Sequence, residues 1–372
     1  MSSQRCQSRP VYHFSDGTAS LKDRTTLHDI AGALGVTTAT VSHALNGLPG
    51  VSSETRVRIL EVARQLHYRP NLAARYLASN RRFRVSVNTL QGTENFEEEL
   101  RDGIATEARS FAFQNIDLDF RTYSGVGDEE ERAFEAALTD EVDGIVLLAT
   151  NTKRLRRSIR HAVRCEIPVV CVVNEIPKSG RLAAVSVDAR VTGSLAADLM
   201  GKLVGGSGEV AINLSDRAGP DAEVFAAFEG ALRSLHPKLR LETIIEDHDI
   251  ESEAYDKCCQ LLRVRKQLAG IYVAARTSRP ALEALQDSSM LSHTTVITND
   301  LSRDLVEEMR SGAVAAIIHQ RPRMQGRAAV RLLYDFLIDG RPPRSNLTLH
   351  PHLLMNGNLD AYLQSLLGET MM

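Results

Sequence analysis

The sequence is poor in the residues that mark several common classes of protein. It has no tryptophan, and aromatic residues make up only 5% of it. Its cysteines are odd in number and contain no Cys-X-X-Cys pair: they are Cys6, Cys165, Cys171, Cys258 and Cys259. This usage argues against a disulfide framework and against a zinc site, and it favours a reduced, cytoplasmic compartment.

Long apolar runs are missing too. No stretch of about 18 apolar residues occurs, so we expect neither a membrane span nor a membrane partner. Residues 1–20 lack the apolar segment of a secretory signal and read as a tail. The histidines are scattered and no Gly-X-Ser-X-Gly motif is present, so no pattern indicates a metal, another cofactor or a catalytic nucleophile. We therefore expect no enzyme activity.

The net charge of −3 hides an uneven distribution along the chain. Residues 1–84 hold twelve Lys and Arg against five Asp and Glu, a balance of 12 − 5 = +7. The remainder must then carry −3 − 7 = −10. A basic head on an acidic body indicates a nucleic-acid contact confined to the first quarter of the chain.

From residue 84 onward, short apolar runs alternate with amphipathic stretches. Val85–Leu90 precedes Glu97–Phe111, for example, and Val210–Leu214 precedes Glu223–Leu235. Alternation of this length predicts parallel sheets covered by helices. About ten such units exceed one small sheet, so we predict two doubly wound α/β subdomains.

The segment from Thr26 to Asn46 predicts a helix-turn-helix. Thr26 and Asp29 have the spacing of a capping box, and Gly35 suits a tight turn at the end of the first helix. Thr37 or Thr38 can then cap a second helix. A simpler interpretation of the segment is a polar helical hairpin that binds nothing.

If the segment binds DNA, the second helix presents its outward side chains to the major groove. Thr38, Ala39 and His43 would meet base edges. Short polar side chains beside them would contact phosphates: Thr37, Thr40, Ser42 and Asn46. A third helix after Ser52 is expected to close the core with Val57, Leu60, Val62, Ala63 and Leu66. Asn71 can cap a further short helix over residues 72–78.

These motifs, together with Val51-Ser52, Thr55-Arg56 and Tyr68-Arg69-Pro70-Asn71, strongly resemble the lac repressor (LacI/GalR) family. The resemblance is close over residues 26–83 and looser beyond. It implies a hinge helix that orders on the operator, with Leu77 wedged into the minor groove and Ala74 at the close-packing position. Many relatives have Arg where this chain has His43, although His also occurs, and His cannot make the bidentate guanine contact that Arg makes, so the resemblance does not fix the base at that position.

The resemblance also implies a domain plan. Residues 1–24 would be a flexible tail, 25–70 the headpiece, 71–83 the hinge helix and linker, and 84–372 an effector-binding and dimerisation domain like periplasmic sugar-binding proteins. Its N-subdomain would take about 84–189 and 320–347, and its C-subdomain about 190–319 and 348–372. Five residues match ligand-contacting positions of such folds: Phe96, Asn174, Asp188, Asp300 and Gln320.

The resemblance implies a homodimer that binds a near-palindromic double-stranded DNA operator under the control of a sugar, sugar acid or polyol. Arg217 or Arg276 could supply a cation for an acidic sugar. A repressor is favoured, and an activator shares the same sequence logic. A cytoplasmic solute-binding protein without a DNA role, or a sugar-processing enzyme on the same layout, would fit the α/β part of the sequence but would leave the helix-turn-helix unexplained.

Overall fold

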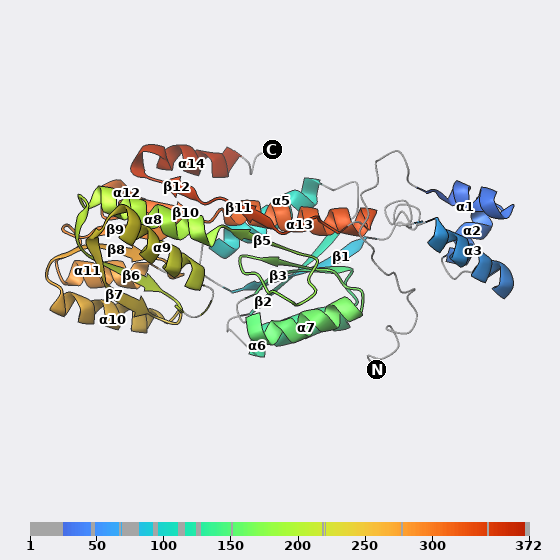
Figure 1. The fold of residues 1–372 in the computed structure, drawn as a ribbon, viewed down its shortest axis with the longest axis horizontal. Coiled ribbons are helices and arrows are strands. Elements are labelled where there is room, and N and C mark those ends of the chain that lie inside the picture. The colour runs from blue at the N-terminus through green and yellow to red at the C-terminus, as the bar shows by residue number, and fades with distance from the viewer. Residues whose placement is uncertain are drawn as a thin grey trace. The chain divides into compact units, whose positions relative to one another are not determined.

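The computed structural model describes most of the chain in two compact units: residues 1–81 with 335–342, and residues 82–334 with 343–372 (Figure 1). The described residues are 25–45, 49–66, 68, 82–91, 96–110, 116–123, 128–149, 152–217, 219, 221–276, 278–340 and 342–368. None of the described helices has both the length and the apolar sequence that a bilayer span requires.

The first unit contains the helices α1 (Leu27–Leu34), α2 (Thr38–Leu45) and α3 (Ser53–Gln65). The predicted capping box is present: the Thr26 hydroxyl accepts from the Asp29 N–H, and the Asp29 carboxylate accepts from the Thr26 N–H. Gly35 ends α1 with φ of 65°, the left-handed conformation that glycine adopts without strain. The predicted two-helix motif therefore forms as its capping and turn residues dictate.

The predicted core face of α3 is partly wrong. Ile59 and Ala63 are buried with Ile30, Val41 and Ala44, whereas Val57 and Leu60 are 62% and 43% exposed. Leu66, also assigned to the core, is 39% exposed. The helix carries apolar residues on two sides, and a core of three short helices can bury only one of them.

The second unit contains two six-stranded sheets. The first has the strand order β11-β5-β4-β3-β1-β2, and its neighbouring strands are parallel throughout. The strands are β1 (Phe83–Leu90), β2 (Ile116–Tyr123), β3 (Gly144–Leu148), β4 (Val169–Val172), β5 (Ala183–Val187) and β11 (Leu347–Leu349). The helices of this subdomain are α5 (Phe96–Ser110), α6 (Asp128–Thr139), α7 (Thr152–Arg164) and α13 (Pro322–Asp339).

Helices α6 and α7 cover one face of this sheet, where Phe134, Leu155 and Ile159 pack on Ile145 and Leu147. Helices α5 and α13 cross closely at two glycines. A Cβ on Gly103 would lie 2.1 Å from the carbonyl oxygen of Arg323, and one on Gly326 would lie 2.3 Å from that of Leu100. Because the backbones touch there, glycine is required at both positions.

The second sheet has the order β12-β10-β9-β8-β6-β7, with only β12 antiparallel to its neighbour. Its strands are β6 (Ser207–Leu214), β7 (Lys238–Glu246), β8 (Leu268–Val273), β9 (Thr295–Asn299), β10 (Ala316–His319) and β12 (His352–Leu354). Its helices are α8 (Ala189–Leu203), α9 (Ala222–Leu235), α10 (Glu251–Val264), α11 (Arg279–Asp287), α12 (Arg303–Ser311) and α14 (Asn356–Gly368).

Alternate residues of the second sheet pack into two hydrophobic cores, one on each face. Tyr272 and Ile297 point toward α8 and α9, whereas Ile271 and Val296 point toward α10, α11 and α12. The strands are therefore buried on both faces, as parallel strands in doubly wound sheets are. The predicted fold class is confirmed: a helix-turn-helix headpiece precedes two α/β subdomains.

Candidate functional site

The outward face of α2 presents the side chains that the sequence assigned to base edges. Thr38, Ala39 and His43 are exposed, and Val41 and Ala44 on the opposite side are buried in the headpiece core. The small exposed side chains leave the backbone of α2 open to close approach. This arrangement suits a helix that enters a major groove about 12 Å wide.

The residues assigned to phosphates lie at the start and along the flank of α2. The Thr37 hydroxyl accepts from the Thr40 N–H at 3.1 Å and lies 2.8 Å from the Thr40 hydroxyl, so Thr37 caps the helix. Thr40 and Ser42 are half-buried. Backbone and hydroxyl groups at a helix N-terminus favour negative charge, which is what a phosphate offers.

His43 is oriented by the turn that follows α2. Its Nδ1 lies 3.2 Å from the carbonyl oxygen of Pro49. A carbonyl oxygen can only accept, so Nδ1 carries the proton in this hydrogen bond. In the neutral ring, Nε2 is then an acceptor.

Four residues of the predicted DNA-binding set lie outside the described residues: Asn46, Asn71, Ala74 and Leu77. The predicted hinge helix lies outside them as well. Their assigned roles remain predictions.

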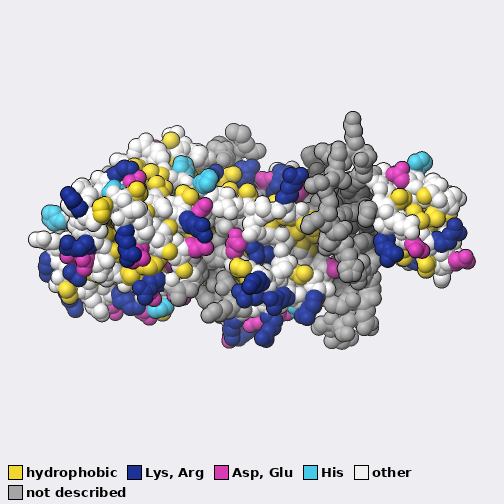
Figure 2. Space-filling view, in the orientation of Figure 1, with side chains coloured by type: hydrophobic (Ala, Val, Ile, Leu, Met, Phe, Trp, Pro, Cys, Tyr) yellow, Lys and Arg dark blue, Asp and Glu magenta, His cyan; other side chains and the backbone are white. Residues whose placement is uncertain are grey.

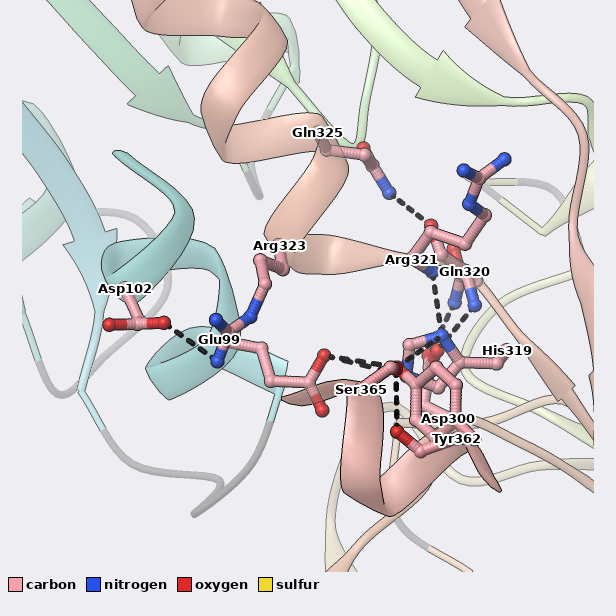
Figure 3. Close-up of polar contacts among 10 residues, drawn as sticks. All are labelled: Glu99, Asp102, Asp300, His319, Gln320, Arg321, Arg323, Gln325, Tyr362 and Ser365. Carbon is pink, nitrogen blue, oxygen red and sulfur yellow. Dashed lines mark hydrogen bonds and ion pairs between the residues drawn. The ribbon is translucent and has the colours of Figure 1, made fainter. Parts of the chain in front are cut away.

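In the second unit, two of the predicted effector residues bind each other. The Asp300 carboxylate, after β9, accepts from the Gln320 N–H at 2.8 Å and from its side-chain amide at 2.7 Å (Figure 3). Gln325 of α13 donates to the Gln320 carbonyl. Burial raises the pKa of Asp300 to about 6, against the opposing effects of His319 and Gln320.

The other three predicted effector residues lie at strand ends or helix starts. Phe96 is the half-buried first residue of α5. The Asn174 amide donates to the Ala149 carbonyl at 2.9 Å, and the Asp188 carboxylate caps α8 by accepting from the N–H groups of Arg190 and Val191. Asp188 thus serves as a helix cap.

Of the nine non-glycine residues with positive φ among the described residues, three lie at these strand ends. Val173, Asp300 and Arg321 have φ of 68°, 52° and 57°, and they follow β4, β9 and β10. The left-handed conformation is costly for any residue with a Cβ, above all for a β-branched one. Such strain concentrates at ligand-binding sites, where the surrounding structure enforces it.

Sequence reasoning missed the acidic first turn of α5. Its three consecutive glutamates each reach a residue of the second subdomain. Glu97 lies 3.9 Å from Arg276, and Glu98 lies 3.7 Å from Arg303. Glu99 lies 3.6 Å from His319 and 3.5 Å from the Tyr362 hydroxyl (Figure 3). We call these residues the inter-subdomain clamp: Glu97, Glu98 and Glu99 with Arg276, Arg303, His319 and Tyr362.

The clamp includes a buried histidine of defined tautomer. The Arg321 N–H donates to Nδ1 of His319, so in the neutral ring Nε2 carries the proton. Nε2 lies 3.1 Å from the Tyr362 hydroxyl and faces Glu99. Partners more than 175 residues apart in sequence, such as Glu97 and Arg276, follow no local pattern, which is why the sequence did not reveal the clamp.

The two arginines suggested for an acidic ligand already have acidic neighbours. Arg217 lies 3.2 Å from Glu246 and over the ring of Phe225. Arg276 faces Glu97, which is only 2% exposed. An anionic ligand at Arg276 would have to approach this buried carboxylate.

The raised pKa of Asp300 gives a testable dependence of stability on pH. The folded carboxyl with a pKa of about 6 binds a proton more tightly than an ordinary aspartate with a pKa of 3.8. Its ionisation therefore lowers the free energy of unfolding as the pH rises from about 4 through 6. In Asp300→Asn this loss should disappear, because the asparagine amide does not titrate. A flipped Gln320 amide can still pair with the asparagine.

The measurement is denaturant unfolding of both proteins between about pH 3 and 7, the range that brackets the two pKa values. Asp117→Asn is the control, because Asp117 is an exposed carboxylate on β2. Parallel pH profiles for Asp300→Asn and the unaltered protein would refute this account of Asp300.

The fold and these two sites define a class of protein: a helix-turn-helix unit followed by a two-subdomain α/β ligand-binding body. Residues 26–71 match the bacterial regulatory proteins of the lacI family, and residues 85–342 match the periplasmic binding protein domain. The chain therefore belongs to the periplasmic binding protein domain family, and its headpiece matches the lacI family of regulatory proteins, as the predicted resemblance implied.

Individual proteins agree with this assignment. Catabolite control protein A of Staphylococcus aureus (strain Mu50) is 30% identical over 164 residues, which cover 44% of this chain and 48% of that protein. The match thus spans about half the length of this curated relative.

Solved structures share the fold of the body. A solute-binding protein of Burkholderia graminis in complex with D-arabinose superposes with a TM-score of 0.70 at 21% identity, covering 76% of this chain and 98% of that one. GanP, a glucose-galactose binding protein of Geobacillus stearothermophilus, gives 0.68 at 19% identity, covering 75% and 99%.

Proposed function

We propose that this protein is a cytoplasmic homodimeric transcriptional repressor whose affinity for a near-palindromic DNA operator is controlled by a neutral sugar or polyol. The observation that carries the proposal is the pairing of an exposed recognition face on α2 with a strained, polar junction between two α/β subdomains. No catalytic step is part of it.

The DNA-binding surface in this proposal is the predicted one. Thr38, Ala39 and His43 read base edges, and Thr37, Thr40, Ser42 and Asn46 hold phosphates. The hinge helix over residues 72–78, capped by Asn71, places Ala74 and Leu77 at the centre of the operator. A single short helix reads only a few base pairs, so two headpieces on a symmetric site supply the required affinity.

The effector in this proposal binds where the strands of the two subdomains end. Phe96 stacks on an apolar face of the ligand, and the hydroxyls contact Asn174, Asp188, Asp300 and Gln320. Two solved structures with this fold support a sugar-like ligand: one contains D-arabinose, and the other is a glucose-galactose binding protein.

In this proposal, the inter-subdomain clamp couples effector binding to DNA binding. Ligand binding changes the angle between the subdomains, and the Glu97–Arg276 and Glu98–Arg303 distances change with it. The hinge then shifts between ordered and melted states, so effector and DNA alter each other's affinity by the same factor.

This reciprocity is the test of the proposal. Operator affinity of the full chain should change about five- to 150-fold at saturation with one member of a panel of neutral sugars and polyols. Titration of labelled operator with and without each sugar measures the change. Operator affinity that is identical with every sugar, although calorimetry detects binding of one, would refute the coupling.

A further inference from the structure

Helix α7 carries an unusual concentration of positive charge. Its 13 residues include six Lys or Arg and one His, with no Asp or Glu. The part of the chain after residue 84 has a balance of −3 − 7 = −10, so this helix stands out from an acidic body. Figure 2 shows the Lys and Arg side chains gathered on the surface over α7.

One side of α7 is neutralised by its neighbour α6. Arg154 pairs with Asp128, and His161 lies 3.7 Å from Glu135. These two residues are seven apart and therefore share a side of the helix. Local ion pairing explains them, and they carry no further role.

The flank of α7 beside Arg154 and His161 is different. Arg157, Arg160 and Arg164 are exposed, and among the described residues no carboxylate lies within ion-pair distance of any of them. Arg160 donates two hydrogen bonds to the carbonyl of Lys178, which places the loop with exposed Lys178 next to the helix. We name Arg157, Arg160, Arg164 and Lys178 the α7 basic stripe.

The α7 basic stripe lowers the stability of the isolated protein. Residues three and four apart on a helix are neighbours, and like charges there repel and destabilise it. Three arginines at spacings of three and four residues form a row about 10 Å long, from a rise of about 1.5 Å per residue. A partner with regularly spaced negative charges would relieve the repulsion.

We propose that the α7 basic stripe contacts the phosphate backbone of duplex DNA that flanks the operator. This inference rests on the proposed DNA-binding function. The headpiece tethers the body to a polyanion, so the stripe meets phosphates at a high effective concentration, which an acidic protein in solution does not reach. Arginine also binds phosphate in a two-pronged geometry that suits this role.

The test compares two duplexes with the full-length protein: a short one limited to the operator, and one with about 20 further base pairs on each side. The variant is Arg157→Gln with Arg164→Gln, since neither side chain pairs with an acid among the described residues of the body. The control is Arg263→Gln with Lys266→Gln, which removes the same charge from exposed positions near α10.

On the long duplex, the α7 variant should bind about threefold or more weakly at low salt. The slope of log affinity against log salt should fall by about 0.9 for each lost phosphate contact. On the short duplex, the variant and the control should match the unaltered protein.

An unchanged slope on the long duplex would overturn the proposal and leave an acidic protein or plain solvation as the explanation of the stripe. An equal loss on both duplexes would overturn it too, because the flanks would then play no part. Failure of the unaltered protein to bind either duplex would instead refute the proposed DNA-binding function, so the two failures are distinguishable.

Discussion

His43→Arg is expected to shift the base preference at one position of each operator half-site to guanine. The Pro49 carbonyl holds the Nδ1 proton of His43, so neutral His43 presents only an acceptor, Nε2, to the groove. An acceptor suits the exocyclic amino group of adenine or cytosine. Arginine instead donates two hydrogen bonds to O6 and N7 of guanine, a discrimination of about 1–3 kcal/mol, or roughly five- to 150-fold.

Selection from a randomised duplex library measures this shift. His43→Ala should flatten the preference at the same position, whereas Ser42→Ala should weaken binding to all sites alike, because a phosphate contact carries no sequence information. If His43→Ala and Ser42→Ala gave the same change across the library, the assignment of His43 to a base edge would be wrong.

Gly103→Ala is expected to destabilise the body by more than about 3 kcal/mol, at the upper end of the cost of overpacking a core. The new Cβ would lie 2.1 Å from the carbonyl oxygen and 2.8 Å from the carbonyl carbon of Arg323, both backbone atoms of α13. Helices α5 and α13 would have to separate, and the glutamates at the start of α5 would move with them. Gly326→Ala, with a 2.3 Å approach, should act in the same way.

The control is the same substitution at a glycine without neighbours. A Cβ on Gly230, within α9, meets nothing within 4 Å. Gly230→Ala should therefore raise the free energy of unfolding by about 0.5–1 kcal/mol, through helix propensity alone. Denaturant unfolding measures the change in the free energy of unfolding for both variants. An unaffected Gly103→Ala variant would show that α5 and α13 do not touch as described.

Much of the fold could be predicted because its determinants are local. Thr26, Asp29 and Gly35 fix the first helix of the headpiece through capping and a left-handed turn. In the body, apolar runs such as Val210–Leu214 became strands, and amphipathic runs such as Glu223–Leu235 became helices. The two-sheet architecture followed from their number and alternation.

The other features depend on contacts between residues that are distant in sequence, and no local pattern predicts those contacts. Helix α3 has two apolar sides, and its packing on Ile30 and Val41 selected the one with Ile59 and Ala63. The clamp joins Glu97 to Arg276, and only the folded arrangement of two subdomains brings these residues together. Asp300 and Gln320 were both predicted as ligand contacts, but their mutual hydrogen bonds join two separate strand ends and follow no sequence pattern.

The central claim is that α2 reads DNA. Selection of sequences bound by the unaltered full-length chain tests it most directly. We predict enrichment of two inverted half-sites, with an adenine or cytosine contacted by His43 in each, and an affinity that falls steeply with salt. Recovery of no enriched sequence, with binding equally weak to every duplex, would contradict the account.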